Sequence, residues 1–190
     1  MADWDRVKWS EAGQILDILG TAPDARVAPD ASTPSAYFQV LRTAEKRVEA
    51  VQFLGQALPR LESVAWAARA VRDLRGEDQA PAAEAKALRA VLLWVQDTTE
   101  TRRRATFDAA EACDPVSAER LAALAAFFSG GSIAPPDCPP LPAPRDAAGK
   151  FASGAVLVAT AGARDMTAAL DACLDAGEAL AHQGLEGAQG

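Results

Sequence analysis

The segment over residues 117–163 constrains the fold most, because it predicts two apolar helices joined by residues that cannot be helical. The first helix follows Ser117, a favourable N-terminal cap, and Gly130 and Gly131 end it. The second helix, predicted over residues 150–161, is apolar on most faces, so other helices must cover it. It is shorter than the ~17–25 residues that a membrane span needs. We therefore expect a buried helix and no membrane span.

Helical signals also fill the rest of the chain. Apolar residues recur at three- and four-residue steps, and no segment shows a convincing alternation of β-branched residues. The pattern over residues 34–58 fits one long helix or two short collinear ones. Residues that favour helix starts or stops are Ser10, Gly20, Thr33, Pro34, Pro59, Gly76, Pro81, Thr99 and Asp165.

These signals predict an all-α fold, a single orthogonal or antiparallel bundle of seven to eight helices with a Pro-rich strap. Residues 1–33 would form an N-terminal helix and linker. Residues 34–183 would form the helical domain, and residues 184–190 a flexible tail.

Composition argues against several classes of function. The 190 residues carry a net charge of −7, and nucleic-acid binding needs clustered Lys and Arg, so no nucleic-acid partner is expected. Three widely spaced cysteines without a C-x-x-C pair indicate reduced thiols and a cytoplasmic location. The first residues include acids and lack the apolar run of a secretory signal. His182 is the only histidine, so neither a zinc site nor a His-dependent triad is expected.

The turn Ser129-Gly130-Gly131-Ser132 invites comparison with phosphate-binding loops. Its spacing does not match G-x-x-x-x-G-K-[ST], and no strand precedes it. It also follows the C-terminus of a helix, where carbonyl groups repel phosphate. We therefore interpret it as a helix stop followed by a sharp turn.

Six prolines follow this turn between residues 135 and 144 and favour extended polyproline geometry. One interpretation is a ligand segment for an aromatic-lined groove of another protein. The interpretation that we favour is a rigid strap across the helices, with Ile133, Cys138 and Leu141 turned inward.

Two further groups of residues are candidates for binding. The run Arg102-Arg103-Arg104 could bind an acidic partner or phosphate, but consecutive helical residues diverge, so a solvated face with Glu100 nearby is the expected role. We expect Arg103 and Arg104 to face outward together with Phe107.

Arg60 and Glu62 lie close to Trp66 in a predicted helix and could form an ion pair or one wall of a small pocket. A structural contact is the simpler interpretation.

Two stretches of the chain resemble a proteobacterial domain of unknown function. They are EAVQFLGQALPRLESVAWAARAV over residues 49–71, and residues 102–161, which contain RRRATFDAA, FFSGGSIAPP and AVLVATA. Members of that family show an LPRREAVWWA-like helix, an RRxA-like helix start, an FWSGGSxAPP-like turn and an AVxLAA-like helix. The resemblance covers roughly residues 34–175, and the SGGSxAPP match is its most specific part.

This sequence departs from the family pattern at Leu61, where a basic residue is favoured, at Ala65, where one tryptophan of a pair is missing, and at Phe128, which replaces a tryptophan. Members of the family are often encoded beside type VI secretion components. The resemblance therefore implies an accessory, adaptor or chaperone role.

Three hypotheses follow. The leading one is a non-enzymatic, cytoplasmic adaptor without a cofactor or metal, which binds another protein. The second is a small-molecule-binding or enzymatic domain, with a pocket formed by the SGGS turn, Arg60, Glu62 and Trp66. The third is a homo-oligomer that associates through exposed Phe107 and Phe127. The candidate partner-binding residues are Arg60, Glu62, Trp66, Arg103, Arg104, Phe127, Ser129, Gly130, Gly131 and Ser132.

Overall fold

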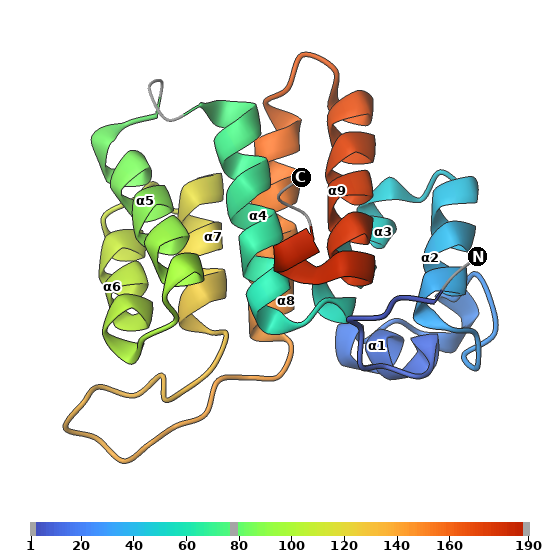
Figure 1. Cartoon of the computed structure of the whole chain (residues 1–190), viewed down its shortest axis with the longest axis horizontal. Coiled ribbons are helices and arrows are strands. Elements are labelled where there is room, and N and C mark those ends of the chain that lie inside the picture. The colour runs from blue at the N-terminus through green and yellow to red at the C-terminus, as the bar shows by residue number, and fades with distance from the viewer. Residues whose placement is uncertain (1–2, 77–79, 188–190) are drawn as a thin grey trace.

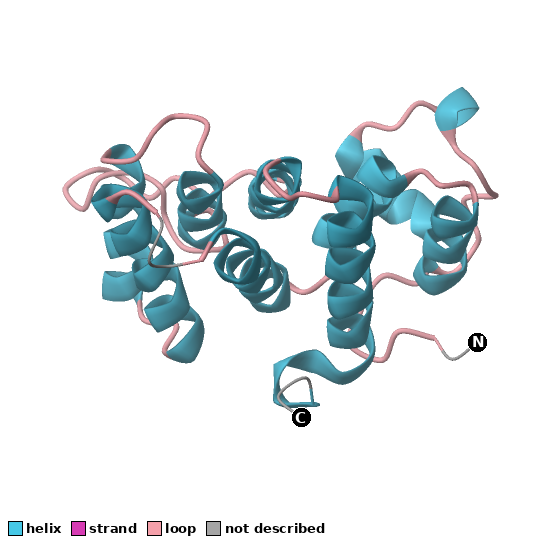
Figure 2. Cartoon of the chain, turned by 90° about the horizontal axis from the view of Figure 1, so that it is seen from above, coloured by secondary structure: helices cyan, strands magenta, loops and turns pink. Residues whose placement is uncertain are grey.

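The computed structural model describes residues 3–76 and 80–187, and this part of the chain is all-helical, as predicted (Figures 1 and 2). It contains nine α-helices and one short 3₁₀ helix, at Pro23–Ala25. The α-helices are α1 (Ala12–Leu19), α2 (Pro34–Thr43), α3 (Arg47–Ala57), α4 (Arg60–Arg75), α5 (Ala82–Gln96), α6 (Glu100–Glu111), α7 (Ala118–Phe127), α8 (Ala147–Ala161) and α9 (Met166–Gly187).

The cap and stop residues predicted from the sequence set most of the helix ends. Gly20 and Gly76 stop α1 and α4 with φ angles of 73° and 71°, values that glycine adopts without steric cost. The Thr33 hydroxyl accepts a hydrogen bond from the Ala36 N–H at 3.3 Å, and a carboxylate oxygen of Asp165 accepts one from the Ala168 N–H at 3.0 Å. These side chains satisfy N–H groups that a first helical turn leaves without partners.

Two predicted helix starts differ. Glu11 rather than Ser10 is the N-cap of α1, because the Gln14 side chain reaches back to the Ser10 and Glu11 N–H groups. Thr99 is the N-cap of α6, as predicted, although its side chain makes no capping hydrogen bond. The apolar helix predicted over residues 150–161 begins earlier, at Ala147. The segment over residues 34–58 forms two helices, separated where Glu45 has a φ of 56°.

Helix α8 lies at the centre of the bundle. It packs against α3, α4, α7 and α9, while α5 and α6 complete one side of the molecule and α1 and α2 the other (Figure 1). Its buried residues are small, so neighbouring backbones approach closely. A Cβ atom at Gly149 would lie 2.9 Å from the Gly55 carbonyl oxygen of α3.

The last helix closes the core from the other side. The Trp66 indole N–H donates to the Cys173 carbonyl oxygen at 2.7 Å, and Trp66 is buried. Helix α9 breaks at Gly184, where φ is 69°, and helical residues continue to Gly187. The break lies at the first residue of the tail predicted over residues 184–190, whose residues 188–190 lie outside the described part. Among the described residues, no helix is long and apolar enough to cross a membrane.

Candidate functional site

The Pro-rich segment between α7 and α8 leaves the bundle instead of crossing it. Figure 1 shows it as a loop that extends beyond the helix ends. Cys138 is exposed and Leu141 is 55% exposed, so their predicted inward placement is wrong; Ile133 is half-buried. The physical reason is the shortage of N–H donors among six prolines, which leaves backbone carbonyls that water satisfies best.

The base of this loop is held together by pairing between its two ends. The Ile133 N–H donates to the Leu141 carbonyl at 2.8 Å. The Ser132 hydroxyl accepts from the N–H groups of Ala134 and Leu141, at 3.2 and 3.1 Å. The loop therefore has a closed base and an exposed, proline-rich end, which we call the Pro-rich loop (residues 132–144).

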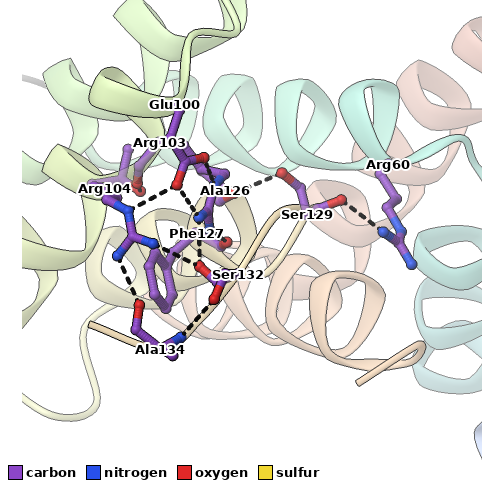
Figure 3. Close-up of polar contacts among 10 residues, drawn as sticks. Arg60, Glu100, Arg103, Arg104, Ala126, Phe127, Ser129, Ser132 and Ala134 are labelled. Atoms are coloured by element: carbon purple, nitrogen blue, oxygen red, sulfur yellow. Dashed lines mark hydrogen bonds and ion pairs between the residues drawn. The ribbon is translucent and has the colours of Figure 1, made fainter. Parts of the chain in front are cut away.

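Arg103 fixes this base to the bundle. Its side chain is almost fully buried, so the prediction that it faces outward is wrong. The guanidinium donates to the carbonyls of Phe127 and Ser132, the latter at 2.7 Å, and lies 4.9 Å from the centre of the Phe127 ring (Figure 3). Burial is favourable because the planar guanidinium meets several acceptors and an aromatic face at once.

Arg104 also binds the base of the Pro-rich loop. It is half-buried and donates to the carbonyls of Ala134 and Ser132, at 3.0 and 3.2 Å (Figure 3). We call Arg103, Arg104 and Glu100 the arginine clamp. Because of this orientation, α6 buries Arg103 and Thr106, whereas Ala105 and Ala112 are exposed.

Glu100 completes the clamp from the preceding turn of α6. Its carboxylate accepts from Arg103 at 2.7 and 2.8 Å and from Arg104 at 2.8 Å. The hydrogen bond from Arg103 holds the pKa of Glu100 below its ordinary value, against a smaller opposing effect of desolvation. The carboxylate thus orients both guanidinium groups toward the loop base.

Within the SGGS turn, the two glycines have different roles. Helix α7 ends at Phe127, as a helix stop predicts, and Gly131 has a φ of 64°. A Cβ atom at Gly131 would lie 3.0 Å from an Arg103 guanidinium nitrogen, whereas Gly130 has open space around it. The turn presents carbonyl oxygens to arginines, as the interpretation as a structural turn expects.

The candidate residues of α4 do not converge on this turn. Only Arg60 reaches it, by donating to the Ser129 carbonyl at 2.9 Å (Figure 3). Glu62 instead lies 3.8 Å from Arg6 near the N-terminus, and Trp66 packs against α9. The pocket hypothesised from Arg60, Glu62, Trp66 and the SGGS turn is therefore not assembled.

A different hollow of about 420 Å³ lies beside the turn. Phe107 and Phe127 line it with ring centres 4.6 Å apart, and Pro135 and Pro136 of the Pro-rich loop form another wall. Phe127 is only 4% exposed, so its predicted role as an exposed oligomerisation residue is wrong. The reason is its position beneath Arg103.

Sequence reasoning missed the importance of Glu100, which it treated as part of a solvated face. The signal was present, because Glu100 lies three and four residues before Arg103 and Arg104, the spacing of helical ion pairs.

Over residues 3–76 and 80–187, no group of three or more His, Cys, Asp or Glu side chains could hold a metal ion.

The fold and this site define an all-helical domain that displays a clamped, proline-rich loop. A family model for a family of unknown function (DUF6931) matches residues 37–181, and the chain belongs to that family. No protein of curated function and no solved structure matches the chain.

Proposed function

We propose that the protein is a non-enzymatic, cytoplasmic adaptor that binds another protein through its Pro-rich loop. The observation that supports this proposal is the combination of an exposed loop end with a base fixed by the arginine clamp. A segment that served only to connect α7 and α8 would not need three hydrogen bonds from two arginines at its base.

The loop is suited to recognition because it is preorganised. Proline fixes φ, and the clamp fixes the loop base, so little conformational entropy is lost on binding. Pro139 and Pro142 have the P-x-x-P spacing, and the exposed Leu141 lies between them. Such a segment fits an aromatic-lined groove on a partner.

Two observations favour an adaptor over an enzyme. The charged groups gathered at the turn, Glu100, Arg103 and Arg104, are engaged with one another and with backbone carbonyls. The pocket expected for a catalytic alternative does not form, since Glu62 and Trp66 contact other parts of the molecule.

The resemblance to a domain often encoded beside type VI secretion components suggests the class of partner. We propose that the partner is a component or cargo of such a secretion system.

The test is a quantitative capture experiment with a loop variant. The triple variant Pro139→Ala, Pro140→Ala, Pro142→Ala should unfold at the same temperature as the wild type, because these residues are exposed, but should lose the captured partner. Pro115→Ala, at an exposed proline outside the loop, is the matched control and should retain it. Equal capture by the triple variant would reject binding through the loop.

The secretion context has its own outcome. Suppose that the wild type and the Pro115→Ala control both capture a partner that depends on the loop but is unrelated to secretion. That result would reject the secretion context and leave the adaptor role intact.

A further inference from the structure

A second hollow, of about 360 Å³, lies where α3 ends, α4 begins and α8 starts, away from the arginine clamp. We call it the α8 hollow. Its walls include Trp9, Ile18 and Leu58, and its volume is in the range of small-molecule sites. The question is which chemistry its polar groups would recognise.

Three cations line the α8 hollow: Lys8, Arg60 and Arg145. In the described part of the chain, none of them lies within ion-pair distance of a carboxylate, although acids outnumber bases in this protein. The nearby carboxylate of Asp146 is paired with Lys150 at 2.6 Å. The hollow therefore has an excess of positive charge that the fold itself does not neutralise.

The N-terminus of α8 adds directed donors. Ala148 and Gly149 line the α8 hollow, and within residues 3–76 and 80–187 their N–H groups have no acceptor. First-turn N–H groups point out of the N-terminal end of a helix and carry partial positive charge. Such an end binds carboxylate and phosphate groups.

Gln56 supplies an independent indication of a ligand. It lines the α8 hollow and is only 8% exposed, yet its Oε1 atom has no hydrogen-bond partner among the described residues. A buried acceptor without a partner is costly, and native proteins retain few of them. A ligand that carries a hydroxyl or amine donor would satisfy this oxygen.

We propose that the α8 hollow binds a small organic anion, with a carboxylate or phosphate head attached to an apolar body. The anionic head accepts hydrogen bonds from the N–H groups of Ala148 and Gly149, and the positive charges of Lys8 and Arg145 attract it. The apolar body packs on Trp9, Ile18 and Leu58, and Gln56 accepts a hydrogen bond from a donor on the ligand. This site is independent of the proposed partner binding, which uses the Pro-rich loop.

The test is a titration of the full chain followed by backbone amide NMR, with phenyl phosphate, benzoate and the neutral benzyl alcohol as probes. The Ala148 and Gly149 resonances should shift and saturate with at least one anion and not with benzyl alcohol. The anion that binds more tightly identifies the head as phosphate or carboxylate. No saturable shift at these amides, or an equal shift with benzyl alcohol, would overturn the proposal.

Two sets of variants sharpen the result. Lys8→Gln with Arg145→Gln should weaken anion binding about tenfold or more, because two charged donors are lost. Arg164→Gln removes one positive charge just beyond the opposite end of α8, where Arg164 is exposed, and should leave binding unchanged. Equal affinities of the double variant and the control would also reject the site.

Gln56 is tested with hydroxybenzoates. At least one of the 2-, 3- and 4-hydroxy isomers should bind the wild type more tightly than benzoate does, and Gln56→Leu should abolish this gain. If no isomer gains affinity, or if the gain survives in Gln56→Leu, the role of Gln56 is wrong.

Discussion

At the scale of single residues, Gly131 is the position in the SGGS turn that requires glycine. Its φ of 64° is unfavourable for other residues, and an added Cβ would meet the arginine clamp at 3.0–3.1 Å. Gly131→Ala should therefore lower the free energy of unfolding by about 1–2 kcal/mol. Gly130→Ala is the matched control, with open space around it, and should cost less than about 0.5 kcal/mol. Urea unfolding of both variants measures the difference, and equal losses would contradict the assignment.

The three cysteines report on the placement of the Pro-rich loop. Cys138 is exposed in the loop, whereas Cys113 and Cys173 are buried. Burial raises the pKa of both thiols, that of Cys173 to about 11, so neither forms much thiolate at neutral pH. A thiol reagent should therefore react rapidly with one cysteine in the native protein and with all three in denaturant. The Cys138→Ser variant should lose the rapid phase; if it keeps that phase, the loop is not exposed as described.

At the scale of elements, the arginine clamp joins α6 to the loop after α7. Arg103→Met should lower the free energy of unfolding by about 2–4 kcal/mol, because the buried Phe127 carbonyl loses its charged donor and the half-buried Ser132 carbonyl keeps only that of Arg104. Arg102→Met is the control in the same run of arginines. The Arg102 side chain is 40% exposed, so this change should cost less than about 1 kcal/mol. Chemical denaturation distinguishes the two, and a similar cost would mean that Arg103 is not a special anchor.

The clamp also has a pH signature. Because the pKa of Glu100 is lowered in the folded state, its contribution is complete above the unfolded-state value of about 4.3 and is lost as the pH falls through the folded-state pKa. Glu100→Gln should thus destabilise the protein by less than about 1 kcal/mol at neutral pH, since the carboxylate is half exposed. The difference from the wild type should shrink as the pH falls below the unfolded-state value and through the lower folded-state pKa. If the difference in free energy of unfolding does not change with pH, the ion pair is not the cause of the Glu100 effect.

The sequence predicts where helices begin and end better than which way they face. Gly20, Gly76, Thr33 and Asp165 act locally, so their roles follow from neighbouring residues. The burial of Arg103 depends on carbonyls 24 and 29 residues away, and no local pattern contains that information. The outward path of the Pro-rich loop was missed for a related reason: its apolar residues suggested burial, whereas its proline-rich backbone needs water.

At the scale of the whole molecule, the same limit applies to the candidate site and to the core. Residues 60–66 and 129–132 are both candidate segments, but only Arg60 joins the SGGS turn, because the tertiary packing directs Glu62 and Trp66 elsewhere. Helix α8 also carries Gly154, and Gly162 is its C-cap, but neither is a place of close approach to another backbone. The closest approach on α8 is instead at Gly149, since the helix begins earlier than predicted and meets Gly55 of α3 there.

That crossing decides how the two sides of the bundle are joined, because α8 contacts α3 on one side and α7 on the other. Gly149→Ala would place a Cβ 2.9 Å from the Gly55 carbonyl oxygen and force α3 away, at a cost of about 1–3 kcal/mol. Gly154→Ala on the same helix meets only Leu121, at 3.4 Å, and should be neutral or stabilise by up to about 1 kcal/mol through helix propensity. Thermal unfolding should remain a single transition in both variants, since the shared central helix makes the bundle cooperative. Opposite signs of the two effects would establish that backbone contact at Gly149, rather than glycine flexibility, sets the arrangement of the helices.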